Sequence, residues 1–196
     1  MRFVTRSTAI HERVAGAILD AAADLLAEGG EPPSMSEVAE AAGVARATLY
    51  RYFPTRERLL QELTAAAIDA TATRLAEADL DAVPVAEGIA RVARVVAAVG
   101  SKYAALVGQF GQFGQFGQGN ADPGEQEQIT AMIDALLRRG IDDGTFRSDI
   151  SVDELRFLLG SLLEAGARLA AEQQAGAEKA AALVTSVFLH GTERRT

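Results

Sequence analysis

The chain of 196 residues contains no cysteine and no tryptophan, and only two histidines, His11 and His190. The absence of cysteine excludes disulfides, thiolate metal sites and cysteine nucleophiles. The two histidines lie near opposite ends of the sequence, and it shows no Gly-x-Ser-x-Gly, phosphate-binding loop or His-rich metal spacing. We therefore predict that the protein is not an enzyme and needs neither a metal nor a cofactor.

Long hydrophobic runs are also missing. No apolar stretch approaches the roughly 20 residues that a membrane-spanning helix needs. The first residues, MRFVTRSTAIHERV, include basic side chains but no apolar core of the kind found in secretory signals. The expectation is a cytoplasmic protein with no membrane partner.

Positive charge is scarce overall but locally concentrated. The formal net charge is −8, which is unfavourable for sequence-independent binding to phosphates. Within residues 46–58, however, Arg46, Arg51, Arg56 and Arg58 face a single acidic residue, Glu57. This distribution permits docking on nucleic acid through one small basic face.

The pattern is helical almost throughout, with about nine helices expected. Apolar residues recur at steps of three and four, and no segment alternates with a period of two. Capping boxes open helices at Ser34 and Ser151, where a serine is followed three residues later by glutamate. We predict an all-α fold with two domains: a compact three-helix DNA-binding unit over 1–54 and a larger helical ligand-binding and dimerisation domain over 55–196.

Two short helices, from Ser34 to about Gly43 and from about 45 to 53, have the spacing of a helix-turn-helix. Gly43 suits the left-handed backbone of the turn. At 100° per residue, Leu49 and Phe53 share the inner face of the second helix. The neighbouring positions then point outward, where Arg, Thr and Tyr side chains can reach bases or phosphates.

This stretch resembles the TetR family of bacterial regulators. The resemblance rests on VAEAAGV, then TLYRYF, then the Pro-Thr-Arg-Glu that starts the next helix; a looser likeness covers GTFRSDISVDELRFLLGSLLEAG. The family implies DNA binding by one face of the helix-turn-helix, which here comprises Ser34, Ala45, Arg46, Ala47, Thr48, Tyr50, Arg51, Tyr52 and Arg56.

Two positions depart from the family pattern. Ala45 stands where the family often has a Ser or Thr cap. The absence of this cap costs about 1 kcal/mol of stability and one phosphate contact. Tyr52 replaces a common histidine, and for this residue packing and DNA contact are equally good interpretations. For Tyr50 and Arg51 we favour DNA, because Leu49 and Phe53 already supply the apolar anchors.

The last two helices are apolar on more than one face, which is typical of helices that pack inward and also against a partner. The resemblance implies a dimeric four-helix bundle, and the alternative is that all these residues form internal core. The predicted dimer-interface residues are Leu159, Leu163, Gly166, Val184, Val187 and Phe188.

The segment 108–119 repeats Gly-Gln-Phe three times. Each glycine disfavours a helix, so we expect a weak helix or an irregular segment. It could form a pliable wall of a ligand pocket, ordinary core or a flexible connector. The resemblance implies a small-molecule pocket in the body, and the candidates suggest an apolar or aromatic ligand: Tyr103, Phe110, Phe113, Phe116, Met132, Leu136 and Phe157.

The sequence thus predicts a homodimeric transcriptional repressor. It would bind a palindromic double-stranded DNA operator and be released by a small, largely apolar effector. The alternative is a helical protein- or ligand-binding module whose helix-turn-helix no longer binds DNA.

Overall fold

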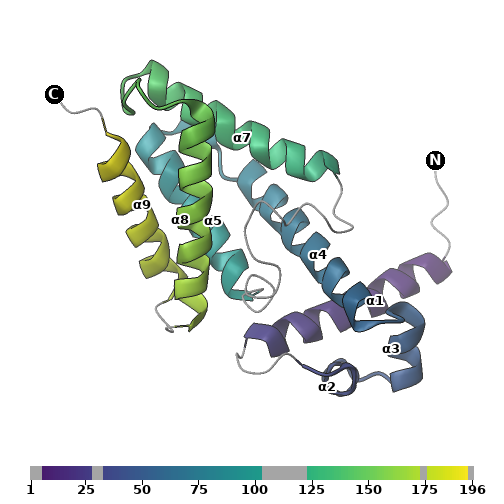
Figure 1. Cartoon of the computed structure of the whole chain (residues 1–196). Coiled ribbons are helices and arrows are strands. Elements are labelled where there is room, and N and C mark those ends of the chain that lie inside the picture. Colours follow the sequence, from purple (N-terminus) through teal and green to yellow (C-terminus); the bar gives the residue numbers. More distant parts are fainter. Residues whose placement is uncertain (1–5, 28–32, 103–122, 173–175, 194–196) are drawn as a thin grey trace.

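The computed structural model describes residues 6–27, 33–102, 123–172 and 176–193. The described residues form eight α-helices and a short 3₁₀ helix, as the all-α prediction requires (Figure 1). Their bounds are α1 Arg6–Ala27, α2 Met35–Ala41, α3 Arg46–Tyr52, α4 Arg56–Ala76, η1 Leu80–Ala82, α5 Val85–Lys102, α7 Pro123–Asp142, α8 Val152–Glu172 and α9 Ala177–Thr192.

Three helices begin where the sequence places a capping residue. The Ser34 hydroxyl accepts from the Glu37 amide, and the Ser34 amide donates to the Glu37 carboxylate at 2.7 Å. The same box recurs between Ser151 and Glu154, with the amide-to-carboxylate bond at 2.8 Å. The Thr55 hydroxyl accepts from the Arg58 amide at the start of α4. Each cap satisfies backbone donors that have no partner within the helix.

The N-terminal helices gather in one lobe, and α4 leads from it into the body of the molecule (Figure 1). Ile18 of α1, Val38 of α2 and Leu49 of α3 lie in one buried cluster. The cluster continues into the first turns of α4, where Leu59 and Leu63 are buried. The core of the N-terminal unit therefore extends past the domain boundary expected at residue 54.

The body is built from α5, α8 and α9, each in contact with the other two, with α7 packed against α5 and α8. Close approach depends on small residues. A Cβ added to Gly166 of α8 would lie 2.4 Å from a methyl of Val184 on α9, and one added to Gly100 of α5 would lie 2.6 Å from Ala167 on α8. These contacts bring the helix backbones close together inside a single chain.

The helix α4, which precedes the connection to α5, is shorter than the sequence indicates. The apolar pattern predicts one helix to about residue 80, but α4 ends at Ala76 and a 3₁₀ turn follows. Asp79, directly before this turn, has a positive φ of 46°, so α4 and the turn do not form one continuous helix. Arg139 of α7 donates to the carbonyl oxygens of Leu80 and Val83, both at 2.8 Å, and so satisfies backbone groups of this turn.

Candidate nucleic-acid interface

The helices α2 and α3 are joined by a tight turn at Gly43. This glycine has φ of 65°, a backbone conformation that penalises residues with a Cβ. The Val44 amide donates to the Ala39 carbonyl at 2.9 Å, and the Gly43 amide to the Glu40 carbonyl at 3.0 Å. These bonds fix the direction in which the chain leaves α2, and so the angle at which α3 is presented.

The short helix α3 turns one face inward and the other to solvent. Leu49 is fully buried and Phe53, directly after the helix, is 4% exposed. Tyr50, by contrast, is 49% exposed. The other outward residues predicted to contact DNA are Arg46, Ala47 and Arg51, all exposed, with Thr48 half-buried. The inner side chains anchor the helix, and the outer ones form a surface with two guanidinium groups, a phenol and small side chains.

The remaining predicted contact residues lie around this face. Ser34 and Ala45 are exposed, at the starts of α2 and α3. Arg56 is half-buried at the start of α4. Tyr52 is half-buried against the N-terminal core, so packing accounts for part of its ring. His11, which the sequence did not single out, stacks on Tyr52; 41 residues separate the two in sequence, and nothing in the local pattern indicates the contact.

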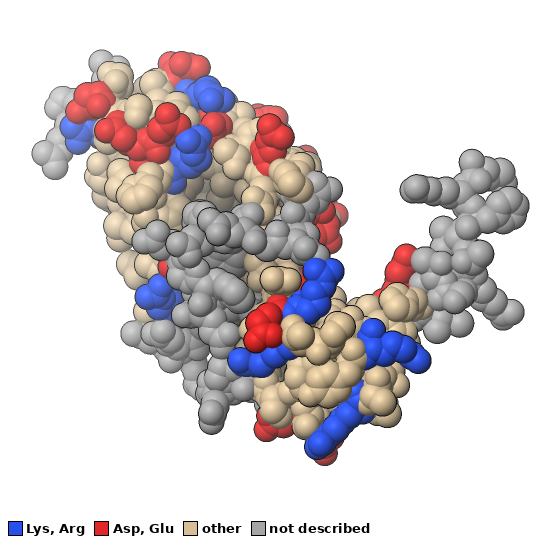
Figure 2. All heavy atoms as spheres, turned by 45° about the vertical axis from the view of Figure 1, so that its right-hand side comes forward, with Lys and Arg blue, Asp and Glu red and all other residues tan. Residues whose placement is uncertain are grey.

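The arginines of α3 are not neutralised by neighbouring carboxylates. Within the part of the chain that the structure describes, neither Arg46 nor Arg51 forms an ion pair, whereas Arg58 of α4 pairs with Glu62 at 2.6 Å. Figure 2 shows several basic side chains spread over the N-terminal lobe. Uncompensated exposed guanidinium groups are suited to phosphate oxygens or to the edge of guanine.

The cap of α2 is sensitive to acid. The backbone N–H of Ser34, and then its hydroxyl, hold the pKa of Glu37 below its ordinary value. A depressed carboxyl pKa stabilises the fold at pH values above the unfolded-state pKa, and this contribution is lost as pH falls through the folded-state pKa. The helix that supports α3 is thus best fixed when Glu37 is ionised.

The start of α3 offers a direct test of helix capping. Ala45 is the N-cap, with the extended backbone (φ −66°, ψ 144°) that a capping residue adopts, but no side chain accepts from the first amides. We expect Ala45→Ser to raise the free energy of unfolding by about 1 kcal/mol. Urea unfolding at fixed protein concentration measures this. Ala47→Ser, the same chemical change inside the helix, serves as the control and should give no gain; equal effects of the two variants would contradict the capping argument.

Comparison with known proteins identifies this helix-turn-helix. Residues 18–63 match the family model of bacterial regulatory proteins, tetR family. A stretch of 81 residues is 38% identical to the HTH-type transcriptional repressor LfrR of Mycolicibacterium smegmatis, covering 41% of this chain and 42% of that protein.

The N-terminal unit is similar to the tetR family of bacterial regulatory proteins.

The match begins within α1, at Ile18, and ends at Leu63 of α4, which is also the last buried residue of the N-terminal core cluster.

Solved structures share the fold along nearly the whole chain. LfrR from Mycobacterium smegmatis in complex with proflavine has a TM-score of 0.70 at 24% identity, covering 95% of this chain and 99% of that one. The regulator FadR from Bacillus subtilis in complex with stearoyl-CoA has a TM-score of 0.66 at 21% identity, covering 91% and 99%. At these identities the likeness establishes the fold. The family is one of transcriptional regulators rather than enzymes.

Large exposed apolar side chains concentrate on the last two helices. Among the described residues, five large hydrophobic side chains are exposed: Tyr50 on α3, and Phe157, Leu158, Leu183 and Val187 on α8 and α9. We call these last four the α8–α9 face. Large apolar side chains exposed together on one part of a surface are typical of a protein interface.

Five of the six residues predicted at the dimer interface are buried within a single chain. Leu159, Leu163, Val184 and Phe188 are 5% exposed or less, and Gly166 is buried against Val184. These residues hold α8, α9 and α5 together within one chain. Of the predicted set, Val187 alone lies on the α8–α9 face. Phe157, predicted as a pocket residue, is 74% exposed and also belongs to this face, because its position on α8 points away from the core.

The other predicted pocket residues fall into two groups. Met132 and Leu136 of α7 do lie toward the body core, Leu136 buried and Met132 half-buried. The prediction for Tyr103, Phe110, Phe113 and Phe116, like that for the whole Gly-Gln-Phe repeat, lies outside the described residues.

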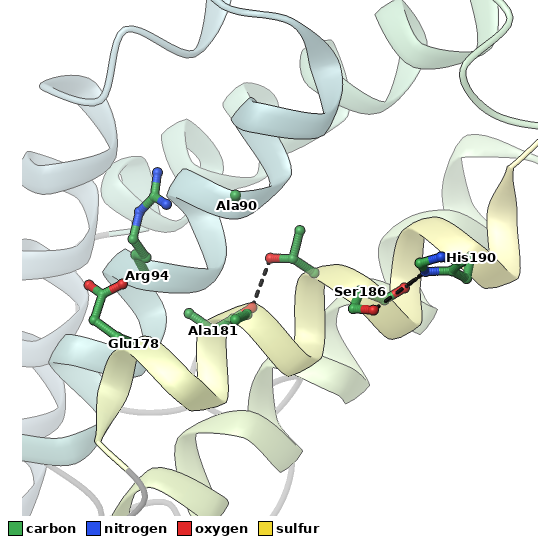
Figure 3. A pocket seen from close by; sticks show the side chains of 8 residues that line it. Ala90, Arg94, Glu178, Ala181, Ser186 and His190 are labelled. Carbon is green, nitrogen blue, oxygen red and sulfur yellow. Dashed lines mark hydrogen bonds between the residues drawn. The ribbon is translucent and has the colours of Figure 1, made fainter.

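A groove of about 350 Å³ runs along the body between α5 and α9 (Figure 3). Most of its polar side chains already have partners: Arg94 donates to Glu87 at 2.7 Å, and Thr185 to the Ala181 carbonyl at 2.8 Å. His190 lies one turn from Ser186, with its Nδ1 2.7 Å from the Ser186 carbonyl oxygen. With these groups engaged, the groove offers little polar recognition, and we assign no ligand to it.

In the described part of the chain, no helix has the length and apolar character needed to cross a membrane. Over the same residues, the His, Asp and Glu side chains form no group of three or more that could hold a metal ion.

Proposed function

We propose that this protein is a transcriptional repressor that binds a two-half-site DNA operator as a homodimer. The observation that carries the proposal is the outward face of α3, where Arg46, Tyr50 and Arg51 are exposed while Leu49 is buried. A helix anchored on one side and bearing unpaired guanidinium groups on the other can enter a major groove and contact both phosphates and base edges. The relative LfrR is a repressor, which supports repression rather than activation as the proposed regulation.

A dimer is proposed because one α3 reads only a few base pairs. Two recognition helices must lie about 34–36 Å apart to occupy successive major grooves on one side of the duplex. The α8–α9 face lies on helices of the body, away from α3 (Figure 1). Pairing of this face about a twofold axis would leave both N-terminal lobes free for DNA.

We further propose that an organic effector with a large apolar part binds in the body and lowers operator affinity. Support comes from two proteins of the same fold, crystallised with proflavine and with stearoyl-CoA. Met132 and Leu136 are the described residues that we assign to the wall of this site. For release, the effector must bind more tightly to a dimer geometry that mismatches the groove spacing.

Removal of the α3 guanidinium groups tests DNA binding. The probe is a 30-base-pair duplex selected by the wild-type protein from a randomised library, and affinity is measured by fluorescence anisotropy over a range of salt concentrations. We expect Arg51→Ala to weaken binding about 10-fold and the Arg46→Ala, Arg51→Ala double variant about 100-fold. Each lost phosphate contact should also reduce the salt slope by about 0.9.

The matched control is Arg74→Ala. Arg74 is exposed on α4, roughly 27 Å along the helix from Arg56 at a rise of 1.5 Å per residue. The Arg74→Ala substitution removes the same charge as the α3 variants do and should leave operator affinity unchanged. If no duplex is selected, or if the α3 variants bind as tightly as the control, the DNA-binding proposal fails and the alternative of a module that has lost DNA binding gains support.

A further inference from the structure

Three side chains from two helices stack on one another at the end of α3. The imidazole of His11 on α1 lies over the phenol ring of Tyr52, with ring centroids 4.4 Å apart and ring planes at 28°. The guanidinium carbon of Arg51 lies 5.4 Å from the centroid of the same ring. Tyr52 thus connects a residue of α1 to an arginine of the outward α3 face.

The helix that carries this arginine has few other restraints. It has seven residues, and its N-cap has no side-chain hydrogen bond. Isolated helices of this length are not stable in water, so the position of α3 depends on packing. Leu49 and Phe53 supply the inner anchors, while the half-buried Tyr52 has its ring partly exposed at the edge of the core.

The imidazole of His11 stacks on this partly exposed ring of Tyr52. Stacking on an aromatic ring restricts the ring's rotation, and a ring held in place can hold a guanidinium group over its face by cation–π attraction. Arg51 would otherwise lose considerable rotamer freedom on binding DNA. A side chain that is ordered before binding loses less, which strengthens the complex.

We propose that His11 is a positioning residue for DNA binding, which acts through Tyr52 to orient Arg51 toward the phosphate backbone. The proposal rests on the proposed function. By this proposal, α1 contributes to operator affinity as well as to the packing of the N-terminal core. His11 itself is not required to touch DNA.

The stack can be tested without DNA. In NMR spectra of the full chain, Tyr52 ring protons above an imidazole experience its ring current, and the chain has only three tyrosines to assign. His11→Ala should shift the Tyr52 signals toward the values of an unstacked tyrosine. His190→Ala, which removes the other histidine of the chain from the exposed side of α9, should leave them in place. Unshifted Tyr52 signals in His11→Ala would overturn the proposal, whether or not the protein binds DNA.

The positioning role is tested with the selected 30-base-pair duplex. His11→Ala and His11→Gln, which lack an aromatic ring, should each bind about 3- to 10-fold more weakly. His11→Phe keeps a ring but no N–H donor, and should restore binding to within about 2-fold of the wild type. His190→Ala should bind as the wild type does. Full affinity in His11→Ala, or no rescue by phenylalanine, would contradict the proposal; the second result would indicate direct contact of the imidazole with DNA.

A double-mutant cycle tests the route through Arg51. If His11 acts by orienting this arginine, then His11→Ala should have little further effect in an Arg51→Ala background. Additive losses would show that His11 acts independently of Arg51 and would overturn the assignment. His11 is exposed, so the variants should fold; thermal unfolding of each protein checks this before titration.

Discussion

Replacing Leu183 and Val187 with aspartate is expected to convert the proposed dimer to folded monomers and to weaken operator binding by about 100-fold or more. Both side chains are about half exposed on α9, and Phe157 and Leu158 are exposed on α8. In the monomer the new carboxylates stay in water and cost little. In a dimer they would be buried without partners, which is strongly unfavourable.

The effect on DNA follows from the loss of linkage between two α3 helices. A dimer that has placed one α3 holds the second near its half-site at a high effective concentration, which typically raises affinity by about 10²–10⁴. A monomer retains the contacts of a single half-site. Sedimentation velocity measures the assembly, and anisotropy with the selected duplex measures the affinity.

The control is Ala182→Asp, which adds a carboxylate to an exposed position of α9 that lines the groove between α5 and α9. It should remain dimeric and bind normally. If the Leu183→Asp, Val187→Asp variant stays dimeric with unchanged operator affinity, the α8–α9 face is not the interface. If it is monomeric but binds as well as the wild type, the two-half-site proposal is wrong.

Much of the fold was predictable because its determinants are local. The serines at 34 and 151 and the threonine at 55 mark helix starts by short-range hydrogen bonds, and the structure has each of these bonds. Gly43 marks the turn for a similarly local reason, its positive φ. The orientation of α3 also followed from periodicity, since Leu49 and Phe53 share one helical face.

What could not be predicted depends on contacts between distant segments. Helices α8 and α9 are apolar on more than one side, so the side that faces the chain's own core cannot be predicted from their sequence. The structure turns Leu159 and Phe188 inward and Leu158 and Val187 outward. The stack of His11 on Tyr52 was missed for the same reason, because helical periodicity describes each helix by itself.

Phe188 and Val187 illustrate this division, and they lead to the second large expected effect. Both were predicted at the dimer interface, yet Phe188 is 1% exposed and packs edge-to-face on Phe146, with ring centroids 5.6 Å apart. We expect Phe188→Ala to lower the free energy of unfolding by about 3–5 kcal/mol, the usual cost of truncating a fully buried phenylalanine. The loss of the aromatic contact is part of this cost.

The measurement is best made in a chain that cannot pair, because dimerisation raises apparent stability by mass action. Phe188→Ala is therefore combined with Leu183→Asp and Val187→Asp, and urea unfolding is compared with that of the monomeric parent. Leu158→Ala in the same background is the matched control: it also truncates a large apolar side chain, but an exposed one, and should change stability by less than about 0.5 kcal/mol. A loss below about 1 kcal/mol for Phe188→Ala would indicate that this ring contributes little to the monomer, and would favour the interface role that the sequence pattern first suggested.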